Sequence, residues 1–346
     1  MIRVGVLGAT GYAGIELIRI LSMHKNAKIM FASSQTYAGK KLAEVYKNLQ
    51  NIVDLTCEEV DVEKVAKSCD VVFTALPHGA SKQIVPALYE AGIKVIDLSG
   101  DFRYKDQAVY EAWYGQEHSA PALLKKSVYG LPELHRDEIA NTSLVGNPGC
   151  YTTCSILGLA PLAKNQWIDM DSIIVDAKSG VSGGGRTTSL GFSYAETDET
   201  MKAYKVATHR HTSEIEQEIG LLAGQEVKLS FTPHLVPLKR GIFATIYAKL
   251  TADMDTKELV NAYKAFYKNE FFIRVHDEGS MPELKYVNGS NFVDIGLCVD
   301  KRLNRVVICS CLDNLIKGAA GQAVQNMSIL FGLDEKTGLN MPGFYL

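Results

Sequence analysis

Two cysteines and two histidines stand where such side chains can do chemistry. Cys150 follows the turn NPG and opens an apolar stretch, CYTTCSILGLAPLAK, that predicts a helix, whereas Cys154 lies one turn deeper in it. The thiolate, not the thiol, is the nucleophile, and the N-terminus of a helix favours it through unpaired N–H groups and the helix dipole. We therefore expect Cys150 to be a nucleophile and Cys154 to belong to the core.

A cysteine nucleophile needs a base, and the segment HRHTSEIEQEIG contains His209 and His211. Ser213 and Glu216 fit a capping box, which places His211 just before a helix. The positive helix end disfavours an imidazolium, so it would keep His211 neutral and able to accept a proton. A zinc site made by both histidines and Cys150 is a rival interpretation, but the sequence offers no clear further ligands nearby and we expect no metal. A surface histidine pair is the other alternative.

A glycine-rich turn near the N-terminus predicts a dinucleotide site. The run GATGYAG stands between a strand-like segment, IRVGVLG, and a helical one. Glycines there let the backbone turn tightly and approach a pyrophosphate held at the N-terminus of the helix. The residues of this turn that we expect to contact the cofactor are Gly8, Thr10, Gly11, Tyr12, Ala13 and Gly14.

The end of the second predicted strand indicates which dinucleotide binds. An NAD site usually carries Asp or Glu there, which binds the ribose hydroxyls. In this chain the strand ends in Ser33 and Ser34, and Lys40 and Lys41 follow. Hydroxyl and ammonium groups suit a 2′-phosphate that a carboxylate would repel. We therefore predict NADP(H) rather than NAD, with a solvated lysine pair as the alternative.

The strands and helices that must position these residues divide the chain into two parts. Residues 1–149 alternate between strand and helix patterns, which is typical of a doubly wound α/β, Rossmann-type domain. Six strand-like runs with few helices follow, and they favour an antiparallel or mixed sheet in an α+β domain, 150–313. The runs between 227 and 250 are predicted to be neighbouring strands. DNLIKGAAGQAVQNMSIL predicts a long final helix, so residues from about 314 to 346 are expected to complete the first domain.

Composition and charge exclude several classes of protein. A chain of 346 residues exceeds what one core usually holds, which agrees with two domains. The net charge of -3 offers no strong field for nucleic acid or an anionic membrane. No apolar run reaches membrane-spanning length and the N-terminus lacks a signal-peptide pattern, so we expect a cytoplasmic protein. Seven irregularly spaced cysteines argue against a disulfide framework.

Nine segments occur in the order in which a known family has them. They are GATGYAG, ALPHGAS, DLSGDFR, YGLPE, GNPGCYTT, SGVSGGGR, HRHTSEIEQ, KRGI and DNLIKGAAGQAVQN. With them the chain closely resembles the N-acetyl-gamma-glutamyl-phosphate reductases of arginine biosynthesis over nearly its whole length. Ser213 stands where the family often has proline, and SGGGR replaces a frequent SGAGR. Neither change removes a chemical group.

The resemblance implies an oxidoreductase that uses NADPH to reduce an acyl phosphate to an aldehyde through a cysteine thioester, in a homo-oligomer (dimer or tetramer). It implies that Cys150 is the nucleophile and that a histidine of the HRH segment is the acid/base; we choose His211, with His209 in reserve. Contacts to the cofactor are also implied for Ser182, Gly183 and Asn314. The phosphate and carboxylate of the substrate need polar or cationic partners, for which the candidates are His78, Arg103, Asn147, Arg186, Lys239 and Arg240.

Two other functions stay open, and each arginine could instead hold a structural ion pair. A phosphorylating aspartate-semialdehyde dehydrogenase would use the same cysteine chemistry on a shorter substrate, although HRHTSEIEQ and YGLPE favour the acetylated glutamyl substrate. A non-catalytic regulator would bind NADP without needing a reactive thiol.

Overall fold

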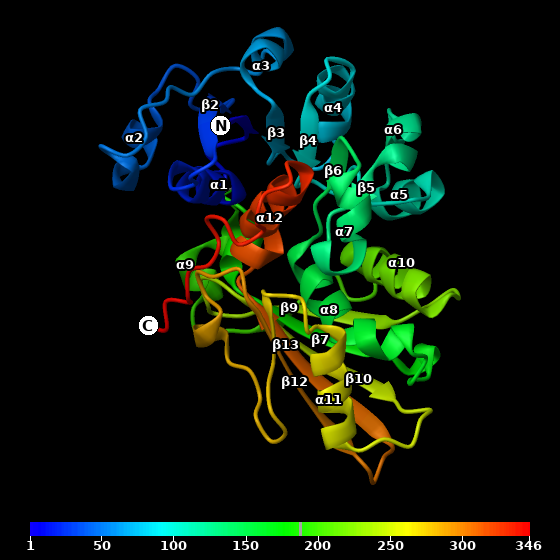
Figure 1. Cartoon of the computed structure of the whole chain (residues 1–346). Helices are drawn as coiled ribbons and strands as arrows, with labels where there is room; N and C mark the ends of the chain where they lie inside the picture. Colours follow the sequence, from blue (N-terminus) through cyan, green and yellow to red (C-terminus); the bar gives the residue numbers. More distant parts are fainter. Residues whose placement is uncertain (187–188) are drawn as a thin grey trace. The chain divides into compact units, whose positions relative to one another are not determined.

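The computed structural model describes residues 1–186 and 189–346, which form two compact units (Figure 1). Unit 1 consists of Met1–Pro148 and Ala319–Asn340, and unit 2 consists of Gly149–Gly318 and Met341–Leu346. Residues 314–318 and 341–346, which the sequence analysis assigned to the first domain, therefore group with unit 2. Among the described residues, no helix has both the length and the apolar character that crossing a bilayer requires.

Unit 1 is built on a six-stranded sheet with the order β2-β1-β3-β4-β6-β5, in which every pair of strands is parallel. The order reverses between β1 and β3, which is the switch point where doubly wound sheets bind ligands. This topology confirms the predicted Rossmann-type α/β class. The strands are β1 (Ile2–Leu7), β2 (Ala27–Ser33), β3 (Val71–Thr74), β4 (Lys94–Asp97), β5 (Val128–Tyr129) and β6 (Leu144–Gly146).

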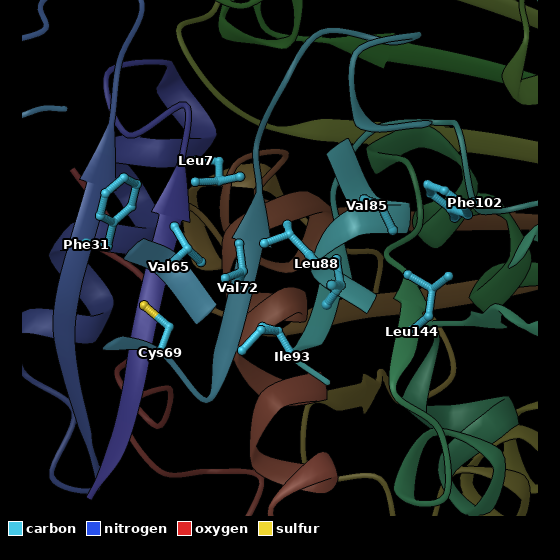
Figure 2. Close-up of a cluster of buried hydrophobic side chains, with 11 residues drawn as sticks. Leu7, Phe31, Val65, Cys69, Val72, Val85, Leu88, Ile93, Phe102 and Leu144 are labelled. Carbon is cyan, nitrogen blue, oxygen red and sulfur yellow. The ribbon is translucent and has the colours of Figure 1, made fainter. Parts of the chain in front are cut away.

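Helices and a buried core support this sheet. Figure 2 shows aliphatic and aromatic side chains from the strands, such as Leu7 and Phe31, beside Val65 of α3 and Val85 of α4. Most strand residues are buried, as expected of a parallel sheet covered on both faces, although Arg3 of β1 and Lys28 of β2 are exposed. The helices of unit 1 are α1 (Tyr12–Ser22), α2 (Leu42–Val45), α3 (Val62–Ser68), α4 (Ser81–Glu90), α5 (Gln107–Tyr114), α6 (Pro121–Lys126), α7 (Pro132–Ala140) and α12 (Gly321–Leu330).

Unit 2 contains a seven-stranded mixed sheet with the order β11-β12-β13-β10-β7-β9-β8. A mixed sheet was predicted, but the prediction that the strands between 227 and 250 are neighbours is wrong, because β7 lies between β9 and β10. The loop that joins those two strands bonds to the end of β7, where Val236 donates its N–H to Ser179 at 3.0 Å. The strands are β7 (Ile174–Ser179), β8 (Lys202–Ala203), β9 (Ser230–Leu235), β10 (Ile242–Lys249), β11 (Ile273–Val275), β12 (Val293–Asp300) and β13 (Arg305–Leu312).

Helix α8 (Cys150–Lys164) packs against β10, β13 and α10 (His211–Ala223), and α11 (Thr256–Phe266) packs against β12 and α8; α9 (Tyr194–Thr197) is short. Along β7, β9 and β10, buried residues on one face of the sheet alternate with half-exposed residues on the other face. We call that other face the open face; it includes Asp176, Lys178, Thr232, His234, Thr245 and Tyr247.

The predicted long final helix is interrupted at its start. A π-helical turn, Ile316–Ala320, precedes α12, which begins only at Gly321. The carboxylate of Asp313 accepts the N–H groups of Leu315 and Ile316 at 2.8 and 3.2 Å, and its backbone carbonyl oxygen accepts the N–H of Gly318 at 2.9 Å. π-Helical turns often mark functional sites.

Candidate active site

Cys150 is the first residue of α8, and Gly149 is its N-cap. The thiol therefore lies at the positive end of the helix dipole, which stabilises a thiolate. Cys150 is half-buried, whereas Cys154 is fully buried and its Sγ lies 3.1 Å from the carbonyl oxygen of Ser310. Burial raises the pKa of the Cys154 thiol to about 12. Of the two cysteines, Cys150 is the one whose surroundings suit nucleophilic chemistry.

Helix α10 begins at His211 itself, so the predicted capping box is wrong. The hydroxyl of Ser213 donates to the carbonyl oxygen of Arg210 at 3.0 Å, and the carboxylate of Glu216 accepts the Leu229 N–H at 3.1 Å. Glu216 thus bonds to the segment after the helix instead of to the helix start. His211 remains in the first helical turn, where the dipole disfavours its protonated form.

His209 lies in an aromatic setting just before α10. Its Nδ1 accepts the backbone N–H of His211 at 3.1 Å, and its ring meets the rings of Tyr151, Tyr204 and Phe231 at 5.7, 5.6 and 5.4 Å. Burial, followed by the nearby positive charges, lowers the pKa of His209 to about 4. A neutral imidazole with its Nδ1 already bonded is a weak base. Across the described ranges, no three His, Cys, Asp or Glu side chains are grouped to hold a metal.

Tyr151 connects the two histidines with the start of α8, and the sequence analysis did not single it out. Its ring lies 6.0 Å from the ring of His211, and it directly follows Cys150. Its hydroxyl donates to the carbonyl oxygen of His234 at 3.1 Å and receives a hydrogen bond from the hydroxyl of Tyr204 at 3.3 Å. Burial raises the pKa of both tyrosines, that of Tyr204 to about 12. The one feature of the sequence that could have identified Tyr151 as a site residue is its position directly after Cys150.

Glu214 is a second residue that the sequence analysis missed. Its buried carboxylate accepts the N–H of Gly149 at 3.0 Å and the hydroxyl of Thr152 at 2.9 Å. The available signal was its spacing of three from His211, which places both side chains on adjacent positions of one helix.

Several candidate residues gather near the ends of β7 and β10. The N–H of Ser182 donates to the carbonyl oxygen of Lys239 at 3.1 Å, and the amide of Asn314 donates to the Ser182 hydroxyl at 3.0 Å. Asn314 also accepts the N–H of Gly241 at 2.7 Å. The structure therefore brings together Ser182, Lys239 and Asn314, which are far apart in the sequence.

The cationic candidates of unit 2 differ in their surroundings. Arg240 pairs with the buried carboxylate of Asp313 at 3.2 Å, which is the structural ion pair considered as its alternative role. Arg186 and Lys239 are exposed, as is Gly183. Arginine and lysine side chains are suited to bind phosphate and carboxylate groups.

The glycine turn of unit 1 has the geometry that a dinucleotide loop requires. Gly8 has a φ of +82°, and a Cβ there would lie 2.3 Å from the carbonyl oxygen of Ala75. A Cβ at Gly14 would lie 2.2 Å from the carbonyl oxygen of Gly8, so helix and turn pack at backbone distance. Gly11 is the N-cap of α1, and Tyr12 and Ala13 are its first residues. The loop therefore fits a pyrophosphate at a helix N-terminus.

The polar residues at the end of β2 join this turn. The hydroxyls of Thr10 and Ser34 lie 2.7 Å apart, and the hydroxyl of Ser33 accepts the N–H of Gly8 at 3.2 Å. Lys41 pairs with Asp54 at 2.8 Å, while the ammonium of exposed Lys40 lies 5.9 Å from the ring of Tyr37. Of the two lysines, Lys40 is the better placed for an anionic ligand.

Three further candidates lie in unit 1. His78 is exposed, and its Nδ1 accepts the N–H of Gly100 at 2.8 Å. Arg103 is 5% exposed and donates to the carbonyl oxygen of Leu98 at 2.8 Å. Asn147 is 0% exposed; it donates to the carbonyl oxygen of Ala319 and accepts from the amide of Asn326. Burial favours structural roles for Arg103 and Asn147.

Known proteins resemble the chain over its full length. Residues 3–142 match the model of the semialdehyde dehydrogenase NAD binding domain, and residues 150–314 match that of the semialdehyde dehydrogenase dimerisation domain. The N-acetyl-gamma-glutamyl-phosphate reductase of Acetivibrio thermocellus is 58% identical over 100% of both chains, and that of Pelotomaculum thermopropionicum is 53% identical over 99% of both.

Solved structures share the fold at lower identity. Aspartate semialdehyde dehydrogenase II from Vibrio cholerae, complexed with ASA, superposes with a TM-score of 0.74 at 18% identity, covering 96% of this chain and 98% of that one. The Candida albicans aspartate semialdehyde dehydrogenase with NADP gives a TM-score of 0.71 at 20% identity with the same coverage. At such identities the likeness establishes the fold alone.

Proposed function

The chain belongs to the family of N-acetyl-gamma-glutamyl-phosphate reductases, and from this premise we propose that it reduces N-acetyl-gamma-glutamyl phosphate to N-acetylglutamate semialdehyde and phosphate with NADPH, in arginine biosynthesis. The observation that carries the proposal is the place of Cys150, half-buried at the first position of α8. A thiol there can ionise and attack an acyl carbon.

The Cys150 thiolate attacks the acyl carbon of the substrate, phosphate leaves with the electrons of the broken C–O bond, and a thioester forms on Sγ. A thioester carbonyl accepts hydride more readily than a carboxylate, which is why covalent attachment helps the reduction. When bound, NADPH supplies that hydride. Cys150 returns to a thiolate as the semialdehyde is released.

His211 is our choice for the acid/base. It would take the thiol proton before attack and return that proton to the Cys150 thiolate once the semialdehyde has left. The surroundings of His209 support this choice, because its Nδ1 already accepts the His211 N–H and its pKa is lowered to about 4 by burial. His209 then holds the backbone of His211 in place.

The cofactor proposal rests on the glycine turn and on the end of β2. Gly8, Gly11 and Gly14 would let the pyrophosphate approach the start of α1, and Ser34 and Lys40 would meet the 2′-phosphate of NADPH. No acidic residue ends β2, where an NAD site would carry one. Further cofactor contacts are proposed for Thr10, Tyr12, Ala13, Ser33, Ser182, Gly183 and Asn314.

The anionic groups of the substrate need cationic partners. Arg186 and Lys239 are exposed and carry donors suited to phosphate or carboxylate. Arg240 could share its guanidinium between Asp313 and a substrate anion. His78 is exposed in the loop after β3. We rank Arg103 and Asn147 below these four because both are buried.

We propose that a second copy of the chain covers the open face of unit 2. The part of the chain that matches a dimerisation domain, 150–314, contains this whole face. Its side chains are half-exposed, as expected of a surface that a partner covers. Thr245→Arg, at the centre of the face, should yield monomers in sedimentation. We expect the enzyme in the cytoplasm, a reducing compartment in which its free cysteines stay thiols.

The reverse reaction tests the function. N-Acetylglutamate semialdehyde with NADP+ and phosphate should be oxidised far faster than aspartate semialdehyde, and NADP+ should be preferred over NAD+. The acyl phosphate without NADPH should leave an acyl mass on the peptide that contains Cys150. Preference for aspartate semialdehyde would favour the dehydrogenase alternative, and an inert thiol with NADP(H) bound would favour a regulator.

A further inference from the structure

The carboxylate of Glu214 is buried where α8 begins. Its Oε1 accepts the backbone N–H of Gly149 at 3.0 Å and the hydroxyl of Thr152 at 2.9 Å, and the residue is 0% exposed. Gly149 is the N-cap of α8 and has no side chain with which to cap it. A buried N–H without an acceptor destabilises a fold, and a carboxylate is favoured at a helix N-terminus. Glu214 therefore satisfies the N–H of the N-cap residue, one of the backbone donors that the helix itself leaves without an acceptor.

The hydrogen bond from the Gly149 N–H to Glu214 is equivalent to one of the two bonds of a capping box, except that the acid belongs to another helix. In a capping box, Glu or Gln at the third helical position reaches back to the N-cap N–H of its own helix. The third position of α8 is Thr152, whose hydroxyl contacts the Gly149 carbonyl oxygen at 2.7 Å as well as Glu214. The acceptor for the Gly149 N–H comes instead from α10, 65 residues along the chain.

Glu214 also lies near the start of its own helix, three residues after His211. Side chains three apart on a helix are neighbours. The carboxylate that binds the N-cap residue of α8 therefore belongs to the same helical turn as His211. Figure 1 shows α8 and α10 next to each other. A displacement of about 1 Å between reacting groups can lower a rate roughly 100-fold.

We propose that Glu214 is a positioning residue, whose buried carboxylate holds the first turns of α8 and α10 together and so keeps His211 aligned with the Cys150 thiol. The inference rests on the proposed function, because it takes these two residues as acid/base and nucleophile. It assigns to Glu214 no contact with the substrate or the cofactor.

The test compares Glu214→Ala with Glu214→Gln in the full chain, using N-acetylglutamate semialdehyde, NADP+ and phosphate. Glutamine keeps a side-chain oxygen that can accept both hydrogen bonds, so we expect this variant to retain most of kcat. Alanine removes the acceptor, and we expect kcat to fall roughly 100-fold while KM changes little. If glutamine retains kcat where alanine does not, the hydrogen bonds that align the helices matter and the negative charge of Glu214 does not.

Glu218→Ala is the matched control, because Glu218 is buried one turn further along α10 and accepts a hydrogen bond from Gln217. It should lower the unfolding midpoint without the loss of kcat. Full kcat in Glu214→Ala, or an equal loss in Glu218→Ala, would overturn the proposal while leaving the proposed function standing.

Two further outcomes also decide the matter. If Glu214→Ala does not fold, Thr152→Val replaces it; this variant lacks one of the two donors, and unchanged kcat there would overturn the proposal. A wild-type chain that fails to turn over this substrate would overturn the proposed function and the inference together.

Discussion

A methyl group on Gly318 would lie 2.7 Å from the Cβ of Cys150, so the π-helical turn Ile316–Ala320 passes Cys150 at a distance that only glycine permits. Carbon atoms normally pack at about 3.5–4.0 Å. Gly318→Ala must therefore displace either the turn or the thiol, and we expect kcat to fall by roughly 100-fold. Gly191→Ala is the control, because its nearest neighbour is the Lys202 ammonium at 3.8 Å. Unchanged kcat in Gly318→Ala would show that the turn can move to fit the methyl group without disturbing catalysis, which would contradict this prediction.

The two cysteines of α8 should differ in reactivity. Iodoacetamide near neutral pH should modify Cys150 and stop turnover in step, because Cys154 is buried and its pKa is raised to about 12. Cys150→Ser should lose activity, whereas Cys154→Ala should keep it with a lower unfolding midpoint. Peptide mass spectrometry identifies the modified residue. First modification at Cys154 would contradict the assignment.

Substitution of His211 should lower kcat more than substitution of His209. His211→Asn should lower kcat by about 10²–10⁴-fold, the usual contribution of a general acid/base. His209→Asn should have the smaller effect, because its amide oxygen can still accept the His211 N–H that His209 accepts now. Steady-state kinetics near neutral pH measures both variants. A larger loss in His209→Asn would transfer the acid/base role to His209.

Burial of His209 should make the fold sensitive to acid. Its pKa is lowered from the ordinary 6.5 to about 4, so between these values the unfolded chain binds a proton that the folded chain does not. Stability is therefore complete above about pH 6.5 and falls as the pH drops toward 4, by on the order of 3 kcal/mol. Urea unfolding of the wild type and of His209→Gln at pH 7.5 and 5 measures how much of the pH-dependent loss in the free energy of unfolding comes from His209. An equal pH dependence in both would contradict it.

Lys40 should determine the preference for the phosphorylated cofactor. Lys40→Glu places a carboxylate where the 2′-phosphate is expected, so KM for NADPH should rise by about tenfold or more and KM for NADH should change little. Lys41→Gln is the control, because Lys41 pairs with Asp54. If the two variants have the same effect on KM for NADPH, the phosphate is bound elsewhere.

Local patterns were sufficient for much of this protein. Alternating strands and helices predicted the parallel sheet of unit 1, because strand and helix periods are properties of neighbouring residues. The glycine turn could be recognised because the positive φ of Gly8 and the close approach of Gly14 each require glycine. The start of α8 at Cys150 followed from the turn NPG and the apolar run after it.

Only the tertiary structure decided which distant residues meet. It inserted β7 between β9 and β10, directed Glu216 to the Leu229 N–H instead of a capping box, and bonded Glu214 to Gly149. It also distinguished the two histidines, because the low pKa of His209 arises from burial among side chains of other elements. The bonds of Glu216 and Glu214 join residues 13 and 65 positions apart, and the period and propensity of a local segment carry no information about its partner.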